Sequence, residues 1–398
     1  MFSFRTTSLI EQEDVVLHKG RVGVFCDQSA WDPESGKYLF EILSERGNLK
    51  KIFWKGDPIW KRMPKDSDVI AMNGNDVSIL RRSIDVKFSD LVEDLKEIDA
   101  MVIEVQDSGV RYCEYEFLLF NLFETLNDNS IDISVYVVDR ENPTGRQVGG
   151  TMLQPEYASV NGVPEVLNRH GLTFGELANF FYSETSAKFP LHIISYFSSK
   201  STKYLMPWSI PSLTDVSGLF TSTFLSGIFL FNGLNISVGI GTNRPYEFIG
   251  SPDYLNMPLD DMAQRLYDPG VFIRPTCFIP RYGLFAGAVC YGFQFLPNPG
   301  DTYHSMAHSI RVIKELQNVL RDENKSLISN DRFKFLIGDD VLLHYLNQAD
   351  DLNMSEKESH DDWAVIKEHI KVDEQKWIRK AKRFMLYDDN LWRIKTII

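Results

Sequence analysis

The first half of the chain alternates short apolar runs with longer stretches in which apolar residues recur every three or four positions. The short runs cover 21–28, 49–54, 100–107 and 133–140. They are almost continuously apolar, which is typical of strands buried on both faces of a parallel sheet. The stretches 36–47 and 115–129 between them have the period of amphipathic helices. This alternation predicts an α/β fold with a Rossmann-like, doubly wound and mostly parallel sheet.

The pattern changes beyond residue 250. Before it, 169–184 predicts a helix that begins with a capping box of Thr173 and Glu176. The apolar stretch 222–241 predicts one or two further buried strands. After it come a proline-rich segment, an aromatic strand at 288–296, a long helix from about Thr302 and a terminal helix at 374–387. We therefore predict a Rossmann-like domain at 1–250 and a smaller α+β domain at 251–398.

Each of the four predicted parallel strands ends in a polar cluster. These clusters are Asp27-Gln28, Lys55-Gly56-Asp57, Gln106-Asp107 and Asp139-Arg140. In open parallel sheets, ligands bind just beyond the carboxyl ends of the strands. Polar loop residues often follow the end of a strand, and this explains any one cluster. It explains less well why all four predicted strands end in one. The sequence therefore predicts a pocket at this edge.

Composition narrows the possible partners. The chain has 398 residues and a net charge of −13, which disfavours nucleic acid and anionic membranes as partners. It has no apolar window long enough to span a membrane, and the acidic stretch near residue 12 does not resemble a signal peptide, so we expect a cytoplasmic protein. The four cysteines are far apart, and His304 and His308 lack a third metal ligand nearby. We therefore predict no metal and no cofactor.

The segment 231–250 is rich in glycine, but it matches neither phosphate-binding motif. It lacks the Gly-Lys-Ser/Thr of a P-loop, and Arg244 occupies the third glycine position of the dinucleotide fingerprint. We expect a strand and a tight turn that exposes Arg244 and Glu247. An arginine can bind a carboxylate, and a glutamate can act as an acid, a base or an acceptor for a sugar hydroxyl.

Three other segments place charged residues at turns: 104–117, 139–145 and 169–171. Any one of them is more often a structural turn than a site. Together they bring several arginines and carboxylates to one edge of the predicted sheet. That combination suits a small, anionic, hydroxyl-rich ligand.

Several motifs in order give the chain a family resemblance. They are "RVGVFCDQSAW", "EVQDSGVRYCEYEFLL", "VVDRENPTG", "RHGLTFGELA", "GTNRPYEFIGSP", "PRYGLFAGAVCYG" and the terminal "KRFMLY". The chain resembles the NamZ-type exo-β-N-acetylmuramidases, a family long known only as a domain of unknown function. Family members remove N-acetylmuramic acid from the non-reducing end of peptidoglycan fragments. The resemblance therefore implies a glycoside hydrolase whose arginines recognise the lactyl carboxylate of that sugar.

The resemblance also suggests site residues. The candidate catalytic residues are Asp57, Asp107 and Glu247. The candidate substrate-binding residues are Arg111, Asp139, Arg140, Asn142, Arg169, His170, Asn235 and Arg244.

The chain departs from the family pattern at several polar positions. Gly56 stands where the family has its candidate catalytic glutamate, and Asp57 stands where it has a histidine. Asn232, Val238 and Ile240 replace two glutamates and an arginine, and Gly149 stands at a further glutamate position.

Three hypotheses follow. The first is an active hydrolase for muramic-acid sugars, and the second is a catalytically impaired paralogue that binds such a sugar as a sensor or partner. The third is a nucleotide-dependent α/β enzyme, which the missing phosphate motifs disfavour.

Overall fold

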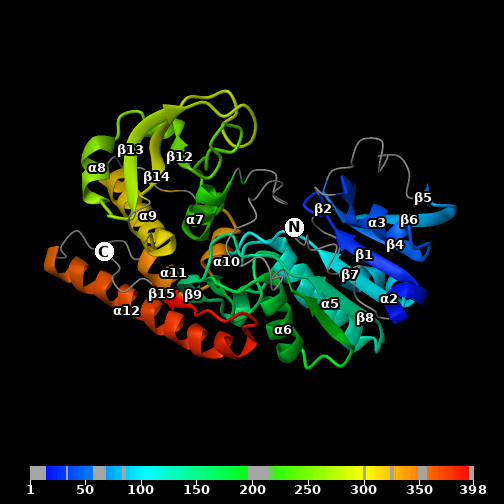
Figure 1. Cartoon of the computed structure of the whole chain (residues 1–398). Helices are drawn as coiled ribbons and strands as arrows, with labels where there is room; N and C mark the ends of the chain where they lie inside the picture. The colour runs from blue at the N-terminus through cyan, green and yellow to red at the C-terminus, as the bar shows by residue number, and fades with distance from the viewer. Residues whose placement is uncertain are drawn as a thin grey trace.

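The computed structural model describes residues 15–32, 35–56, 69–82, 87–195, 216, 218–298, 302–322, 327, 329–347 and 356–393. Within these residues the largest sheet has seven strands (Figure 1). In spatial order they are β11 (Leu191–Ile194), β8 (Ser134–Val138), β7 (Ala100–Glu104), β1 (Val22–Cys26), β4 (Leu49–Lys55), β6 (Asn75–Arg82) and β5 (Val69–Met72). All neighbouring pairs are parallel except β5 and β6.

The strand order confirms the predicted Rossmann-like fold. Taken along the chain, the six parallel strands follow the 3-2-1-4-5-6 order of doubly wound sheets. The order reverses between β1 and β7, and the crevice at the carboxyl ends of these two strands is the usual ligand position in such sheets.

Apolar side chains on the two sheet faces enter separate cores. Along β1, Val24 packs in one buried cluster and Phe25 in the other. Helices α5 (Glu114–Asp128) and α6 (Phe174–Glu184) pack on the Phe25 side, as shown by Leu119 and Leu177 in the same cluster. α3 (Leu39–Ser44) covers the opposite face through Phe40.

The second unit is a smaller α+β assembly, in agreement with the predicted fold class (Figure 1). Its antiparallel sheet has the order β12 (Phe248–Ser251), β14 (Cys290–Pro297) and β13 (Val271–Phe278). Its helices are α7 (Leu219–Ile228), α8 (Leu259–Arg265), α9 (Ser305–Asp322), α10 (Phe333–Ile337) and α11 (Asp340–Asn347). One core joins these elements and includes residues on both sides of position 250, such as Phe224 and Phe293. The boundary at residue 250 itself stays a prediction.

The terminal helix α12 (Glu356–Ala381), orange to red in Figure 1, returns to the first unit. Its Trp377 and Ala381 belong to the core that contains Phe25. The short strand β15 (Trp392–Arg393) pairs with β9 (Gln147–Met152), which is also paired with β10 (Leu167–Arg169). The end of the chain therefore helps to hold β9 and β10 in place.

The remaining described elements are short. They are α2 (Val15–Lys19), β2 (Trp31–Asp32), β3 (Lys37–Tyr38), α4 (Val92–Lys96) and the 3₁₀ turns at Phe88–Leu91, Pro155–Tyr157, Phe229–Gly233, Pro252–Tyr254 and Lys382–Phe384. Within the described ranges, no helix is both long and apolar enough to cross a membrane.

Three secondary-structure predictions were wrong or incomplete. The stretch 222–241 does not form strands, because α7 and a 3₁₀ turn occupy most of it. A short apolar run does not distinguish a buried helix from a buried strand. The terminal helix begins at Glu356, well before residue 374. The β5–β6 hairpin was not predicted, although Asn73-Gly74, both with positive φ, is a recognised hairpin turn sequence.

Candidate functional site

The structure brings polar residues from the ends of β1, β7 and β8 together, while the pocket predicted at this edge stays a prediction. The Arg140 Nη2 atom donates to Glu104 Oε1 and to the Ser29 carbonyl oxygen, both at 2.6 Å. The Tyr115 hydroxyl donates to Asp27 Oδ2 at 2.6 Å. Asp57, the fourth predicted contributor, lies outside the described residues. The charged groups at this edge that the structure describes are thus bonded mainly to one another.

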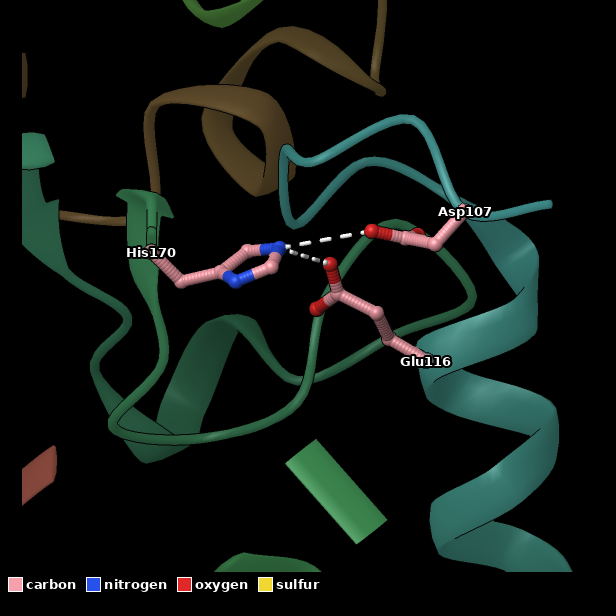
Figure 2. A group of neighbouring side chains, drawn as sticks. All are labelled: Asp107, Glu116 and His170. Carbon is pink, nitrogen blue, oxygen red and sulfur yellow. Dashed lines mark ion pairs between the residues drawn. The ribbon is translucent and has the colours of Figure 1, made fainter. Parts of the chain in front are cut away.

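A second cluster, formed by Asp107, Glu116 and His170, lies beside this edge (Figure 2). The His170 Nε2 atom is 3.1 Å from Glu116 Oε1 and 3.5 Å from Asp107 Oδ2. All three side chains are buried, and they come from the loop after β7, the first turn of α5 and the end of β10. Two predicted site residues, Asp107 and His170, are therefore in contact.

The hydrogen bonds of His170 indicate which ring nitrogen carries the proton. The Leu172 amide donates to Nδ1 at 3.1 Å, so Nδ1 acts as an acceptor. In the neutral ring the proton is then on Nε2, the atom that faces the two carboxylates. Burial lowers the pKa of His170, but the carboxylates of Glu116 and Asp107 raise it by more. The net effect is a raised pKa. A proton added at Nδ1 would displace the Leu172 amide, which opposes that rise.

Apart from the ion-pair contacts given above, most polar atoms of this cluster have no hydrogen-bond partner in the described structure. They are both carboxylate oxygens of Glu116, Oδ1 of Asp107 and Nε2 of His170. Asp107 Oδ2 does accept the Gly109 amide at 2.7 Å. Burial raises the pKa of Glu116 to about 6, so this carboxyl keeps a proton much closer to neutral pH than an exposed glutamate does.

Two groups of side chains have ligand atoms close enough to surround a metal ion. They are Asp107, Glu116 and His170, and Asp339, His369 and Asp373. In the first group, the ring proton on Nε2 occupies the nitrogen that would have to bind the metal. In the second, Asp339 and Asp373 accept hydrogen bonds from the Leu342 and Met152 amides. We therefore carry neither group forward as a metal site.

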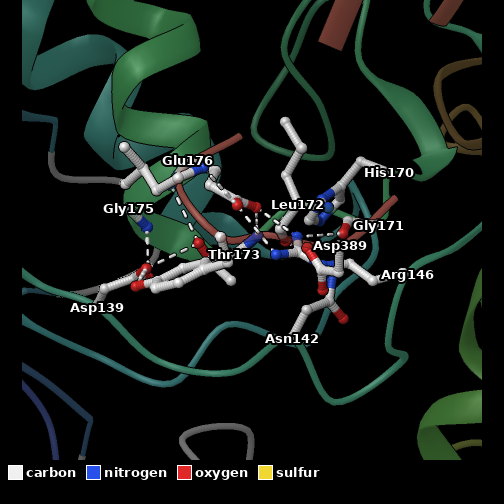
Figure 3. Close-up of polar contacts among 12 residues, drawn as sticks. Asp139, Asn142, Arg146, His170, Gly171, Leu172, Thr173, Gly175, Glu176 and Asp389 are labelled. Atoms are coloured by element: carbon white, nitrogen blue, oxygen red, sulfur yellow. Dashed lines mark hydrogen bonds and ion pairs between the residues drawn. The ribbon is translucent and has the colours of Figure 1, made fainter. Parts of the chain in front are cut away.

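Asp139 has a different environment (Figure 3). Its Oδ1 accepts the amides of Arg140 and Gly175 at 2.8 and 2.7 Å. Its Oδ2 accepts the hydroxyls of Thr173 and Tyr387 at 2.8 and 2.5 Å. A side chain on Gly175 would collide with this carboxylate, so glycine lets it approach the first turn of α6. Asp139 is a buried structural cap, even though burial raises its pKa to about 6.

The neighbouring motif residues also make structural bonds. Thr173 and Glu176 form the predicted capping box at the start of α6. Arg146 pairs with Glu176 and Asp389, and the Asn142 amide donates to the Leu172 carbonyl oxygen at 2.8 Å (Figure 3). These contacts hold the turn that leads into α6 and fix His170 beside it.

Two predicted arginines differ in their bonding. Arg111 is fully buried and donates to three backbone carbonyl oxygens, those of Thr151, Leu336 and Ile337. This placement joins β9 to α10 and gives Arg111 a structural role. Arg169 is buried on β10, and its described hydrogen bond goes to the Thr144 carbonyl oxygen.

The turn at 242–247 exposes only one of its two predicted residues. The side chain of Arg244 is 57% exposed, whereas that of Glu247 is 5% exposed. The expectation that Glu247 would be exposed was therefore wrong, because the turn folds it back onto α7, where Thr221 donates to its Oε1 at 3.0 Å. Arg244 Nη1 lies 3.6 Å from Glu247 Oε2. Asn235 is half-buried in the preceding turn.

Comparison with known families covers most of the chain. Residues 22–214 match the model described as exo-β-N-acetylmuramidase NamZ, N-terminal, and residues 224–387 match its C-terminal counterpart. The chain belongs to the NamZ family. A relative from Bacillus subtilis (strain 168), a peptidoglycan β-N-acetylmuramidase NamZ, is 30% identical over 255 residues, which are 62% of this chain and 60% of the relative.

Two solved structures share the fold of this NamZ-family chain. One is a DUF1343 family protein from Bacteroides fragilis NCTC 9343, with a TM-score of 0.78 and 21% identity over 97% of this chain and 98% of that one. A second DUF1343 family protein from the same strain has a TM-score of 0.70 and 20% identity, with 97% and 99% covered.

The positions that depart from the NamZ pattern are mostly in apolar or structural surroundings. Val238 is buried in the core of the second unit, and Ile240 packs against that core. A side chain on Gly149 would contact the ring of His304, which pairs with Glu374 at 2.6 Å. His308 bonds the Tyr303 hydroxyl and the Leu266 carbonyl oxygen, and both histidines are buried.

Glu116 was missed among the site residues of this NamZ-family protein. It lies in the first turn of α5, and the positions three and seven residues further on, Leu119 and Phe123, are buried. A glutamate on the buried face of a helix is rare unless it is paired or functional. That position within the helical period was the available signal.

Proposed function

We propose that this protein binds and hydrolyses a glycoside of N-acetylmuramic acid at the non-reducing end of a peptidoglycan fragment. Family membership supports a glycosidase that acts on peptidoglycan. The observation that carries the proposal is the buried Asp107–His170–Glu116 cluster, in which His170 Nε2 lies 3.1 Å from Glu116 Oε1 and the Gly109 amide is the one other described donor to the carboxylates. Buried polar groups without partners are costly, so evolution retains them where a ligand or a reaction uses them.

The chemistry requires one carboxyl group to donate a proton to the leaving oxygen and a second carboxylate on the other side of the bond. Glu116 has the property of a proton donor, because burial raises its pKa to about 6. Asp107 adjoins it, and His170 orients the pair. We assign Glu247 as the second carboxylate, since it is buried beside Arg244 and has one described hydroxyl donor. Asp57 stays a candidate acid.

A second candidate function is binding without hydrolysis. Two of the positions that carry charged residues in the family pattern are occupied here by Val238 and Ile240, in apolar surroundings. A loss of charged groups from a pocket lowers catalysis more than it lowers sugar binding. In this case the protein acts as a sensor or partner for the same sugar.

The test is release of 4-nitrophenol from 4-nitrophenyl N-acetylmuramide. We expect turnover by the wild-type protein and a decrease in kcat of roughly 10²–10⁴-fold for Glu116→Gln, the usual size of an acid–base contribution. Glu156→Gln is the matched control, since Glu156 is exposed, and it should retain full activity. Saturable binding of N-acetylmuramic acid without turnover would favour the second candidate. Stabilisation by nucleotides but not by sugars would favour the nucleotide-dependent alternative.

The proposed partner is a small sugar or oligosaccharide. The net charge of −13 argues against nucleic acid and anionic membranes as general partners. The expected cytoplasmic location stays a prediction, and fractionation of expressing cells would test it.

A further inference from the structure

The loop at 279–289 connects β13 and β14, the yellow-green hairpin of Figure 1, and it exposes large apolar side chains. Ile279, Tyr282 and Leu284 are 55%, 58% and 45% exposed, and Val289 is 39% exposed. Exposed apolar residues that occur singly are normal, but a group of them on one element marks a contact with a protein or a membrane. The loop is therefore a candidate interaction surface.

Backbone contacts fix the loop in this exposed conformation. Within it, the Gly287 amide donates to the Pro280 carbonyl oxygen at 2.8 Å. The Arg281 amide donates to the Gly241 carbonyl oxygen at 2.9 Å, which ties the loop to a neighbouring turn. A side chain on Gly241 would collide with the backbone of Tyr282, so glycine permits this close approach. The loop is thus already ordered, and little further ordering is needed when a partner binds.

Phe285 shows that the loop divides its large apolar side chains into two groups. Its ring packs against a small buried cluster that contains Phe248 and Phe278, whose rings stack at 5.0 Å. Tyr282 and Leu284 are close to Phe285 in the sequence, yet they stay exposed. One side chain therefore anchors the loop, and the others remain on the surface.

The charge of this hairpin differs from that of the rest of the chain. Residues 269–300 contain no aspartate or glutamate, whereas the whole chain has 55 of them and a net charge of −13. The charged residues of this stretch are Arg274 and Arg281, and both are exposed. Asp260 and Asp261 line a groove beside β13 that includes no residue of the loop. The hairpin therefore combines exposed apolar side chains with a local positive charge.

We propose that the loop 279–289 docks the protein on a phospholipid membrane surface. Its aliphatic and tyrosine side chains enter the boundary between headgroups and acyl chains, where such residues are favoured. Arg274 and Arg281 bind lipid phosphates. An anionic surface repels the acidic remainder of the chain, so the net charge of −13 orients the hairpin toward the lipid. This docking is independent of the proposed function.

Two other occupants fit the hairpin less well. A glycan presents hydroxyls that need acceptors, and residues 269–300 have no carboxylate to bind them. A symmetric dimer brings the same patch of both copies together, so each Arg281 would meet a second positively charged patch. A lipid surface instead offers phosphates to the arginines and an apolar interior to the side chains between them.

Co-sedimentation of the full chain with lipid vesicles tests this assignment. We expect the wild-type protein to bind vesicles of equal parts phosphatidylcholine and phosphatidylglycerol. The double substitution Tyr282→Ser and Leu284→Ser should weaken this binding at least about tenfold, because burial of one large apolar side chain contributes about that factor. The matched control is Tyr267→Ser and Val365→Ser, which removes two apolar side chains that are 64% and 62% exposed elsewhere. The control should bind as the wild type does.

Arg281→Gln separates the contribution of charge from that of apolar burial. It should weaken binding to the mixed vesicles about fivefold, the usual contribution of one basic residue near an anionic surface. Binding to vesicles of phosphatidylcholine alone should not change. Since all the substituted side chains are exposed, the melting temperatures of the variants should equal that of the wild type, which shows that the fold is intact.

Three results would overturn the assignment. The first is a wild-type protein that stays in the supernatant with both vesicle compositions. The second is equal binding by the loop double variant and its control. The third is a wild-type dimer in analytical ultracentrifugation that the loop double substitution converts to monomers, because a second copy of the chain then covers the loop.

Discussion

Asp139 and Glu116 are both buried carboxyl groups whose pKa burial raises to about 6, yet their surroundings differ. Asp139 accepts four hydrogen bonds, two from amides and two from hydroxyls (Figure 3). Glu116 has one close polar partner in the described structure, His170, whose Nε2 atom lies 3.1 Å from Oε1 (Figure 2). A raised pKa therefore does not distinguish the structural cap Asp139 from the proposed site residue Glu116. The number of hydrogen bonds that each carboxylate accepts does.

Arg146 and Arg169 show the same contrast between a buried charge with partners and a buried charge without a counter-ion. Glu176 and Asp389 outweigh the effect of burial and raise the pKa of Arg146, whereas burial without a partner lowers the pKa of Arg169. In both comparisons the satisfied residue bonds the start of α6.

The largest effect on stability should come from Asp139→Ala. The change leaves four donors without their acceptor, and two of them are backbone amides, that of Arg140 and that of Gly175 in the first turn of α6. We expect the free energy of unfolding to decrease by about 3 kcal/mol or more, as measured by urea denaturation at pH 7. A decrease below about 1 kcal/mol would remove the distinction between Asp139 and Glu116.

Glu116→Gln should have a smaller effect of the opposite sign. Folding raises the pKa of Glu116 from 4.5 to about 6, so its carboxyl binds more protons in the folded state than in the unfolded state. Its contribution to stability is therefore greatest below pH 4.5 and is lost as the pH rises through 6. At pH 7 the neutral glutamine should stabilise the protein by on the order of 1 kcal/mol, because it removes a buried charge but also the ion pair with His170.

The pH dependence provides the control for Glu116→Gln. Between about pH 4.5 and 6 the variant should lose less stability than the wild type, while the contribution of Asp139 to this slope remains. If the variant is less stable than the wild type at pH 7, Glu116 is a structural residue like Asp139.

Tyr387→Phe should have the smallest effect. It removes one of the four donors to Asp139 and leaves the other three in place. We expect a decrease in the free energy of unfolding of about 1 kcal/mol, measured in the same urea titration. A decrease as large as that of Asp139→Ala would show that the four donors do not act as separate contributions.

Much of the first unit could be predicted from the sequence because its signals are local. Four apolar runs became β1, β4, β7 and β8, and Thr173 with Glu176 formed the expected capping box. The prediction failed at α7, where an apolar run with several small residues is compatible with either a helix or a strand. It also failed for Glu247, whose burial depends on packing of the turn against Thr221.

The sequence predicted which residues lie at the candidate site better than it predicted what each of them does there. Asp107 and His170 were named as site residues and lie in contact, although they are far apart in the chain. Asp139, Arg111 and Asn142 were named with them, but their contacts are those of structural residues. Motif position alone does not show whether a charged side chain already has its partners.

The sequence by itself determined the strand–helix alternation, the helix start at Thr173 and the family, because each depends on neighbouring residues or on motif order. Only the tertiary structure decided which charges are neutralised. One of the two hydroxyls that bond Asp139 comes from Tyr387, 248 positions away. Whether Arg169 meets a carboxylate likewise depends on segments that fold around it. Pairing of buried charges is a long-range property, so it emerges only when the chain has packed.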